Sequence, residues 1–179
     1  MVWRPPVDDR FCQEVGKLII WWGFLEVKFD NFIQRMAKVT GTPLKENFRK
    51  VLKIGQRFER FSKEAVLCFD AFPAIQSELL DIRTKMETYQ LDRDMFAHGK
   101  IGLLWPSPNP CGPTLSITYR RNKADIHRLY VLEDVQALVR ELTSLMDRFD
   151  GLTEENAFGR SAWSSQELSA LRDFLSRSR

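Results

Sequence analysis

The sequence predicts a mainly α-helical protein, with a four-helix up-and-down bundle, a small β-hairpin between the third and fourth long helices, and a short C-terminal helix. The main observation is that four long segments repeat apolar residues at steps of three and four, the spacing of one face of an α-helix. The second is a pair of short segments that alternate apolar and polar residues around a basic turn, which is typical of a hairpin.

The first two helices are separated by a segment that interrupts helical structure. Apolar spacing places the first helix at residues ~9–39 and the second at residues ~44–63. Between them lies Gly41-Thr42-Pro43, and glycine and proline mark turns. The expected buried faces consist of Phe11, Val15, Leu18, Trp22, Leu25, Phe29 and Ile33 in the first helix and of Phe48, Leu52, Phe58 and Phe61 in the second.

The third helix leads into the hairpin. It is expected to end at Gly99, because glycine is favoured just past a helix C-terminus. Prolines crowd residues 103–113, which predicts a loop. Residues 114–119 and 126–132 then alternate around the basic tip Arg120-Arg121-Asn122-Lys123, so these two segments predict the hairpin.

Two more helices are expected in the C-terminal part of the chain. Glu133-Asp134 opens the fourth long helix, and Ser164-x-x-Glu167 is a capping box before a short terminal helix. A length of 179 residues fits one domain. We expect a helical bundle over residues 1–152, and a linker with the C-terminal helix, packed on the same domain, over residues 153–179.

Composition limits the partners and the location. Lys and Arg outnumber Asp and Glu by 27 to 24, which permits a polyanionic partner without arguing for one. Three dispersed cysteines predict neither a disulfide framework nor a zinc site, and they favour a reducing compartment. The most apolar run, residues 18–25, is far too short to span a bilayer. We therefore expect a cytoplasmic protein with no membrane partner.

One motif remains after the common chemistries are set aside. The chain has no glycine-rich phosphate loop, H-E-x-x-H or G-x-S-x-G, so no cofactor and no metal are expected. What remains is Arg93-x-x-x-x-His98 at the end of the third helix. Arg93 falls within the apolar arc of its helix, as Glu26 does on the first helix. Because a buried charge needs a partner, we predict that Glu26 and Arg93 pair.

His98 adds chemistry to this pair. It lies one helical turn after Asp94, so the carboxylate is expected to hold the imidazole, while the helix end leaves the ring accessible. An imidazole and a guanidinium can cleave RNA without a metal. His98 would take the proton from a 2′-hydroxyl, and Arg93 would stabilise charge on the phosphate.

The segment from Arg93 to Gly99, Arg-Asp-Met-Phe-Ala-His-Gly, resembles the Arg-polar-x-x-x-His signature of HEPN domains, four-helix proteins of many bacterial defence and toxin systems. The Trp22-x-x-x-Glu26 pattern on the first helix, the position of the motif at a helix end and the hairpin that follows also resemble the layout of that family. The resemblance covers residues 9–152.

The resemblance implies a metal-independent endoribonuclease that leaves 2′,3′-cyclic phosphate ends, in a bacterial defence or toxin-antitoxin setting. It implies His98 as general base and Arg93 as phosphate stabiliser. Asp94 would orient them, and Glu26 would be the acidic residue of the first helix. Members usually form a homodimer with a composite active site, and an antitoxin or partner enzyme can accompany them.

Two alternatives stay open beside the nuclease. Some members of the family have lost catalysis, so the chain can also be a catalytically inactive nucleotide-binding or interaction and dimerisation module. A third alternative is a structural bundle in which Glu26 and Arg93 only fix the helix register.

Basic residues provide candidate phosphate contacts for RNA. A basic stripe on the second helix is also compatible with an ordinary solvated face, whereas Lys100 lies beside His98 in the sequence. The RNA-binding candidates are Lys100, Arg49, Lys53, Arg57, Arg120 and Arg121.

Two features have less defined roles. Trp21, Phe24 and Val27 give the first helix a second apolar face, which fits burial within the same chain as well as a dimer interface. His127, in the hairpin, has no arginine five places before it, and we assign it no role.

Overall fold

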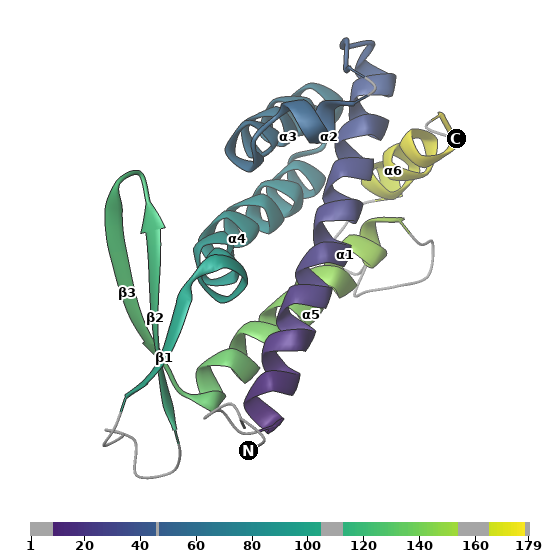
Figure 1. Cartoon of the computed structure of the whole chain (residues 1–179). Coiled ribbons are helices and arrows are strands. Elements are labelled where there is room, and N and C mark those ends of the chain that lie inside the picture. Colours follow the sequence, from purple (N-terminus) through teal and green to yellow (C-terminus); the bar gives the residue numbers. More distant parts are fainter. Residues whose placement is uncertain (1–8, 46, 105–112, 154–164, 178–179) are drawn as a thin grey trace. The chain divides into compact units, whose positions relative to one another are not determined.

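The computed structural model describes residues 9–45, 47–104, 113–153 and 165–177 (Figure 1). The prediction of a mainly helical protein is confirmed, and a small antiparallel sheet accompanies the helices. No helix in these ranges combines the length and the apolar character that crossing a membrane requires. The elements are α1 (Asp9–Thr40), α2 (Phe48–Val51), α3 (Ile54–Phe69), α4 (Pro73–His98), β1 (Lys100–Leu104), β2 (Thr114–Arg121), β3 (Ala124–Tyr130), α5 (Leu132–Thr153) and α6 (Ser165–Arg177).

The chain divides into two compact units. The first, here called the sheet unit, comprises residues 1–23 and 89–144, and the second, the helical unit, comprises residues 24–88 and 145–179. The helices α1, α4 and α5 each contribute residues to both units. The predicted division into a bundle and a C-terminal segment stays a prediction, and the capping-box residue Ser164 lies outside the described residues.

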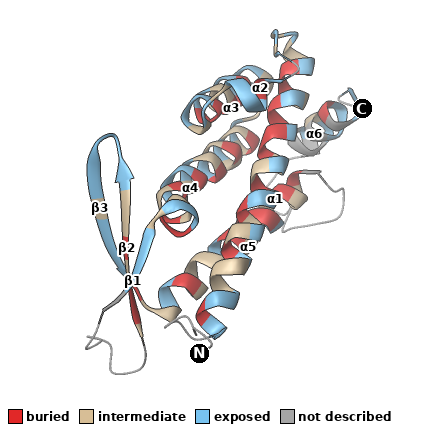
Figure 2. Cartoon of the chain, in the orientation of Figure 1, coloured by how far each residue is buried: buried red, intermediate tan, exposed pale blue. Residues whose placement is uncertain are grey.

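Phenylalanines fill the core of the helical unit. Phe29 stacks on Phe61, with ring centres 4.2 Å apart, and meets Phe149 edge-on. The Phe174 ring lies 5.7 Å from that of Phe32, which attaches α6 to α1. Each such pair contributes about 0.5–1.5 kcal/mol beyond the burial of its area. Figure 2 shows the buried residues as red stretches along these helices.

The prediction of one continuous helix over residues 44–63 is wrong. The backbone is extended at Leu52 and Lys53, which separates α2 from α3, and α3 continues past the predicted end. In a straight helix Phe48 would lie about 140° around the axis from Phe61, yet both rings are buried. The break allows both of them to reach the core of the helical unit.

The hairpin is confirmed, and the sheet has one strand more than predicted. Asn122 and Lys123 form its two-residue turn, with φ of 53° and 67°, as the twist of a hairpin requires. The strand order is β1-β2-β3, and β1 was not predicted. Its last two residues fall in the segment expected to be a loop, of which residues 105–112 lie outside the described part.

One face of the sheet is buried. Leu115, Ile117 and Tyr130 are at most 5% exposed. They share a face, because residues directly opposite each other in an antiparallel pair point the same way and alternate along each strand. The Tyr130 ring lies 4.6 Å from the ring of Phe96, so this face packs on the last turns of α4.

Candidate active site

The motif Arg93-x-x-x-x-His98 lies in the sheet unit and ends α4. The last helical hydrogen bond runs from the Gly99 N–H to the Met95 carbonyl oxygen over 2.8 Å, so the predicted helix end is confirmed. Strand β1 begins at Lys100. His98 therefore occupies the final helical turn, and its side chain is exposed, as the sequence predicts.

Gly99 allows the helix to pass directly into the sheet. A Cβ at this position would lie 2.5 Å from Cγ2 of Ile117 and closer still to the Met95 carbonyl oxygen. Real Cβ atoms essentially never show such contacts. The glycine is needed because β2 packs tightly against the helix end. It allows β1 to begin at Lys100, directly after the helix.

Trp22 and Asp94 both contact Arg93. Its guanidinium carbon lies 5.4 Å from the centre of the Trp22 ring, and Nη1 donates to Oδ1 of Asp94 over 2.7 Å. Trp22 is only 2% exposed, so surrounding side chains hold its ring in place beside the guanidinium. A guanidinium over a tryptophan face gains about 0.5–2 kcal/mol. The Arg93 side chain keeps 21% of its surface exposed, so a substrate can reach it.

Asp94 does not hold the imidazole as expected. Within the described residues, the His98 ring makes no hydrogen bond, and the Asp94 carboxylate accepts from Arg93 instead. A charge-assisted bond to a guanidinium is stronger than a bond to a neutral ring, which explains the preference. The His98 ring therefore faces solvent without a protein partner in that part of the chain.

A buried network next to the motif was missed by sequence reasoning. Asp92, 8% exposed, accepts hydrogen bonds from the Tyr130 hydroxyl and from Nη1 of Arg128. Its partners lie 36 and 38 residues further along the chain, so no local spacing marks them. Burial, and then the Asp92 carboxylate, raise the pKa of Tyr130 far above its usual value. Tyr130 thus remains a donor that ties β3 to α4.

Glu26 lies in the helical unit, beside a second buried network. Its Oε2 is 3.6 Å from Nη2 of Arg57, whose Nη1 donates to Asp30 over 2.8 Å. Burial raises the pKa of Asp30, although Arg57 and Arg49 oppose this effect. The predicted pairing of Glu26 with Arg93 stays a prediction.

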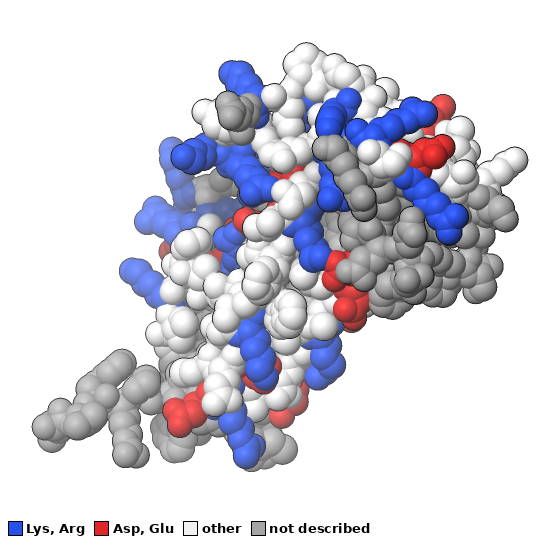
Figure 3. Space-filling model, turned by 90° about the vertical axis from the view of Figure 1, so that its right-hand side faces the viewer, with Lys and Arg blue, Asp and Glu red and all other residues white. Residues whose placement is uncertain are grey.

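One candidate phosphate contact on the second predicted helix is buried, and its contact with phosphate stays a prediction. Arg57 is only 9% exposed and is occupied by Asp30, so it is not a surface cation. Arg49 and Lys53 are exposed, and Arg49 donates to Asn31 over 2.7 Å. Figure 3 shows many Lys and Arg side chains on the upper part of one face of the molecule.

The candidates on the sheet are accessible. Lys100, Arg120 and Arg121 are all exposed, and they lie on β1 and β2 of the same sheet. Lys100 and Arg120 therefore project from the same face of this sheet, which starts immediately after the motif, whereas Arg121 projects from the opposite face.

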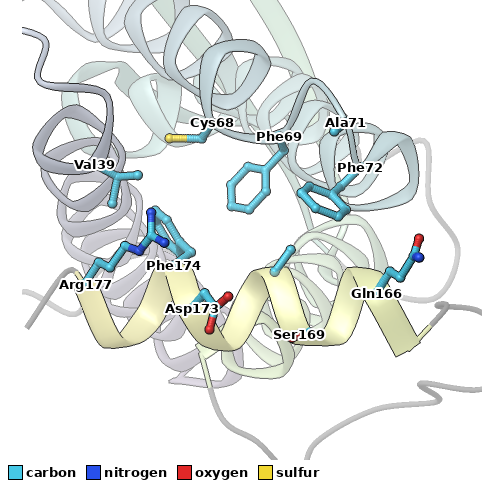
Figure 4. Close-up of a pocket in the computed structure, with 11 residues that line it drawn as sticks. Val39, Cys68, Phe69, Ala71, Phe72, Gln166, Ser169, Asp173, Phe174 and Arg177 are labelled. Carbon is cyan, nitrogen blue, oxygen red and sulfur yellow. The ribbon is translucent and has the colours of Figure 1, made fainter.

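A pocket of about 570 Å³ lies in the helical unit, between α6 on one side and α1, α3 and the turn after α3 on the other (Figure 4). Phe69, Phe72 and Phe174 form its apolar wall, and Asp173 and Arg177 reach toward it from α6. Cys68 is its only thiol among the lining residues, and burial raises the pKa of that thiol to about 12. A thiol of this kind is a poor nucleophile, so the pocket offers no obvious reactive group.

Within the described ranges, no three or more His, Cys, Asp or Glu side chains are grouped so that they could hold a metal ion. Comparison of the chain with protein-family models, with curated proteins and with solved structures finds no match. The function must therefore be argued from the site itself.

Proposed function

We propose that the protein is a metal-independent endoribonuclease of HEPN type that cleaves RNA to 2′,3′-cyclic phosphate ends. The observation that carries the proposal is an exposed imidazole, His98, on the same helix end as a guanidinium, Arg93, that Trp22 and Asp94 hold in place. The site thus combines an acid-base group with an oriented cation, which are two of the groups that this reaction needs.

The reaction follows from these two groups. The His98 imidazole takes the proton from a ribose 2′-hydroxyl, and the 2′-oxygen then forms a bond to the adjacent phosphorus. The bond from phosphorus to the 5′-oxygen of the next nucleotide breaks, and that oxygen must receive a proton. Arg93 stabilises the negative charge that develops on the phosphate oxygens. Cleavage leaves a cyclic phosphate on one product and a 5′-hydroxyl on the other.

We also propose that the chain forms a homodimer with a composite active site. The proposal includes the up-and-down four-helix layout of HEPN domains. One motif supplies one imidazole, whereas the reaction needs a base and an acid. A second copy of the chain would provide the acid from its own His98. A bacterial defence or toxin-antitoxin setting, with an antitoxin or partner enzyme, is the biological role that follows from the proposal.

Exposed apolar residues on α1 support such an interface. Ile20, Phe24 and Val27 are 60%, 54% and 47% exposed and follow the spacing of one helix face. Gly16 and Gly23 lie on the same face, and a Cβ at either position would meet nothing within 4 Å. A second helix can therefore approach this face closely.

One observation favours a second function, a non-catalytic RNA-binding or interaction module. Asp94 already compensates part of the Arg93 charge, and a phosphate would have to compete with this carboxylate for the guanidinium. If the phosphate does not displace Asp94 from the guanidinium, the motif binds nucleotides weakly and does not cleave RNA.

Cleavage in the absence of metal distinguishes the two functions. We expect the purified protein to cut mixed-sequence RNA in EDTA and to leave cyclic phosphate ends, and His98→Ala to lower the rate by at least ~100-fold while folding normally. Lys63→Ala, which removes an exposed residue of α3 outside the proposed site, is the control and should leave the rate unchanged. RNA that is bound but stays intact at high protein concentration would favour the module.

A further inference from the structure

The register of the sheet brings together residues that are far apart in the sequence. Lys100 on β1 is opposite Thr118 on β2, and Thr118 is opposite His127 on β3. Opposite residues of an antiparallel sheet project from the same face. These three side chains therefore form one row across the sheet, on the face opposite to the buried Ile117.

A hydrogen bond orients the histidine of this row. Oγ1 of Thr118 lies 2.8 Å from Nδ1 of His127. When the hydroxyl is the donor, the ring carries its proton on Nε2, on the side away from Thr118. That N–H can then donate to an oxygen of a ligand above the sheet. His127 itself is exposed, so a ligand has access to it.

Apart from Thr114, which is buried at the far end of β2, this face is partly or fully exposed at the positions of β2 and β3, and it carries mainly positive charge. Arg120 lies two residues after Thr118 and is exposed, and Asp125, opposite Arg120, is the one carboxylate on the face among the described residues. Ser116 is opposite Leu129, and Gly102 is opposite Ser116. Because both residues are small, no bulky side chain covers the backbone of β1 and β2 at these positions. Figure 2 shows most of β3 and the turn end of β2 as exposed.

We propose that this face of the sheet, centred on the row Lys100-Thr118-His127, binds the sugar-phosphate backbone of single-stranded RNA. The inference rests on the proposed function for its ligand and extends it by assigning the path of the RNA. Lys100 and Arg120 supply cations for phosphates, and Nε2 of His127 donates to a phosphate oxygen between them. Because Lys100 follows His98 by two residues, an RNA strand on this face leads to the motif.

The chemistry of the row favours RNA over an acidic peptide. Phosphates recur at short, regular intervals along a nucleic acid, and a row of separated donors across three strands can contact several of them. In RNA-binding domains of the RRM type a sheet face also holds a single strand, there through aromatic side chains that stack on the bases.

Binding can be measured apart from cleavage in the His98→Ala background. The probe is a fluorescein-labelled single-stranded RNA of mixed sequence, and the readouts are the Kd and its dependence on salt. We expect Lys100→Ala and Arg120→Ala each to lower the salt slope by about 0.7, the value for one phosphate on a single strand, and to weaken binding several-fold. Lys63→Ala, which removes an exposed lysine from α3, is the matched control.

Thr118 is a positioning residue, and coupling tests its role. Thr118→Val should weaken RNA binding when His127 is present and should have no further effect in His127→Ala, since it acts through the imidazole. Circular dichroism of each variant checks the fold. A sheet that is merely structural would show equal effects of Thr118→Val in both backgrounds.

The outcomes separate this inference from the proposed function. Weakened binding by the sheet variants in a protein that never cleaves RNA would overturn the nuclease and support the sheet as an RNA surface. Metal-free cleavage, with Kd and salt slope unchanged in Lys100→Ala, Arg120→Ala and His127→Ala, would overturn the inference and leave the nuclease intact. An acidic peptide that displaces the RNA from the sheet at equal charge would also overturn it.

Discussion

The guanidinium carbon of Arg93 lies 5.4 Å from the centre of the Trp22 ring, which itself is only 2% exposed. The cation of the motif thus rests on a rigid, buried surface contributed by α1, more than seventy positions earlier in the chain. A cation that is held before the substrate arrives stabilises developing charge without having to reorganise.

The first prediction concerns this support. Trp22→Phe keeps an aromatic ring but weakens the cation–π contact and leaves a small cavity, so we expect a loss of about 1–3 kcal/mol in unfolding free energy. The cleavage rate per folded molecule should fall as well. Phe11→Leu, another buried position of α1, should cost similar stability without changing that rate. Urea unfolding and metal-free cleavage measure the two quantities, and equal rates in both variants would contradict the role of Trp22.

The second prediction concerns the turn from helix to strand. Gly99→Ala places a methyl group against the Met95 carbonyl oxygen and Ile117, so we expect it to destabilise the protein by about 1–3 kcal/mol. Gly102→Ala, on β1, has its nearest contact at 3.8 Å and should cost at most about 1 kcal/mol. Thermal or urea unfolding of both variants gives the comparison. If Gly99→Ala has the same unfolding free energy as the wild type, β2 does not pack closely against the helix end.

The third prediction is a dependence on alkaline pH. The pKa of Tyr130 is raised in the folded state, so folding favours its protonated form. Its contribution to stability is fully present below the unfolded pKa of about 10 and declines as pH rises above it, by at most about 1.4 kcal/mol per pH unit. Cys68, with its raised pKa, acts in the same direction.

Tyr130→Phe isolates the tyrosine. The variant should be about 1–3 kcal/mol less stable at pH 7, because Asp92 loses a donor. The difference in unfolding free energy between wild type and variant should shrink between pH 10 and pH 11. A difference that stays constant over this range would show that Tyr130 ionises in the folded protein as it does in the unfolded chain.

The fourth prediction concerns the buried pair of the helical unit. Arg57→Met leaves the Asp30 carboxylate buried without its closest cation, and we expect a loss of about 3–5 kcal/mol. The double variant Arg57→Met with Asp30→Leu should regain much of the lost stability, because both buried charges are then removed. The folded double variant should bind RNA as the wild type does, because Arg57 is not on the surface. Weaker RNA binding by this variant would restore Arg57 as a phosphate contact.

The fifth prediction concerns assembly. Phe24→Asp puts a charge into the exposed apolar face of α1, and we expect it to turn a dimer into a monomer in sedimentation velocity at micromolar concentration. Leu67→Asp, on α3 and equally exposed at 54%, is the control and should leave the dimer intact. A monomeric wild-type protein that still cleaves RNA would remove the composite site from the mechanism.

Local sequence patterns were sufficient for most elements of the fold. The long helices, the end of α4 at Gly99 and the hairpin around its basic tip follow from spacing and turn chemistry that a few neighbouring residues express. The break between α2 and α3 did not follow, because the glycine beside it, Gly55, is a residue that a helical pattern tolerates. It arises from the need to bury Phe48 and Phe61 in one core, and that need depends on neighbours from other helices.

The candidate site shows the same division. Arg93 and His98 lie in the last two turns of one helix, and this placement is visible in the sequence alone. Contacts between distant segments decided the rest. They placed Trp22 under Arg93, Asp92 among the donors of β3, and His127 in line with Lys100. Spacing along a chain predicts only which residues share a face of one element, whereas strand register and core packing determine which elements meet, and therefore which charges are buried and which remain exposed for a ligand.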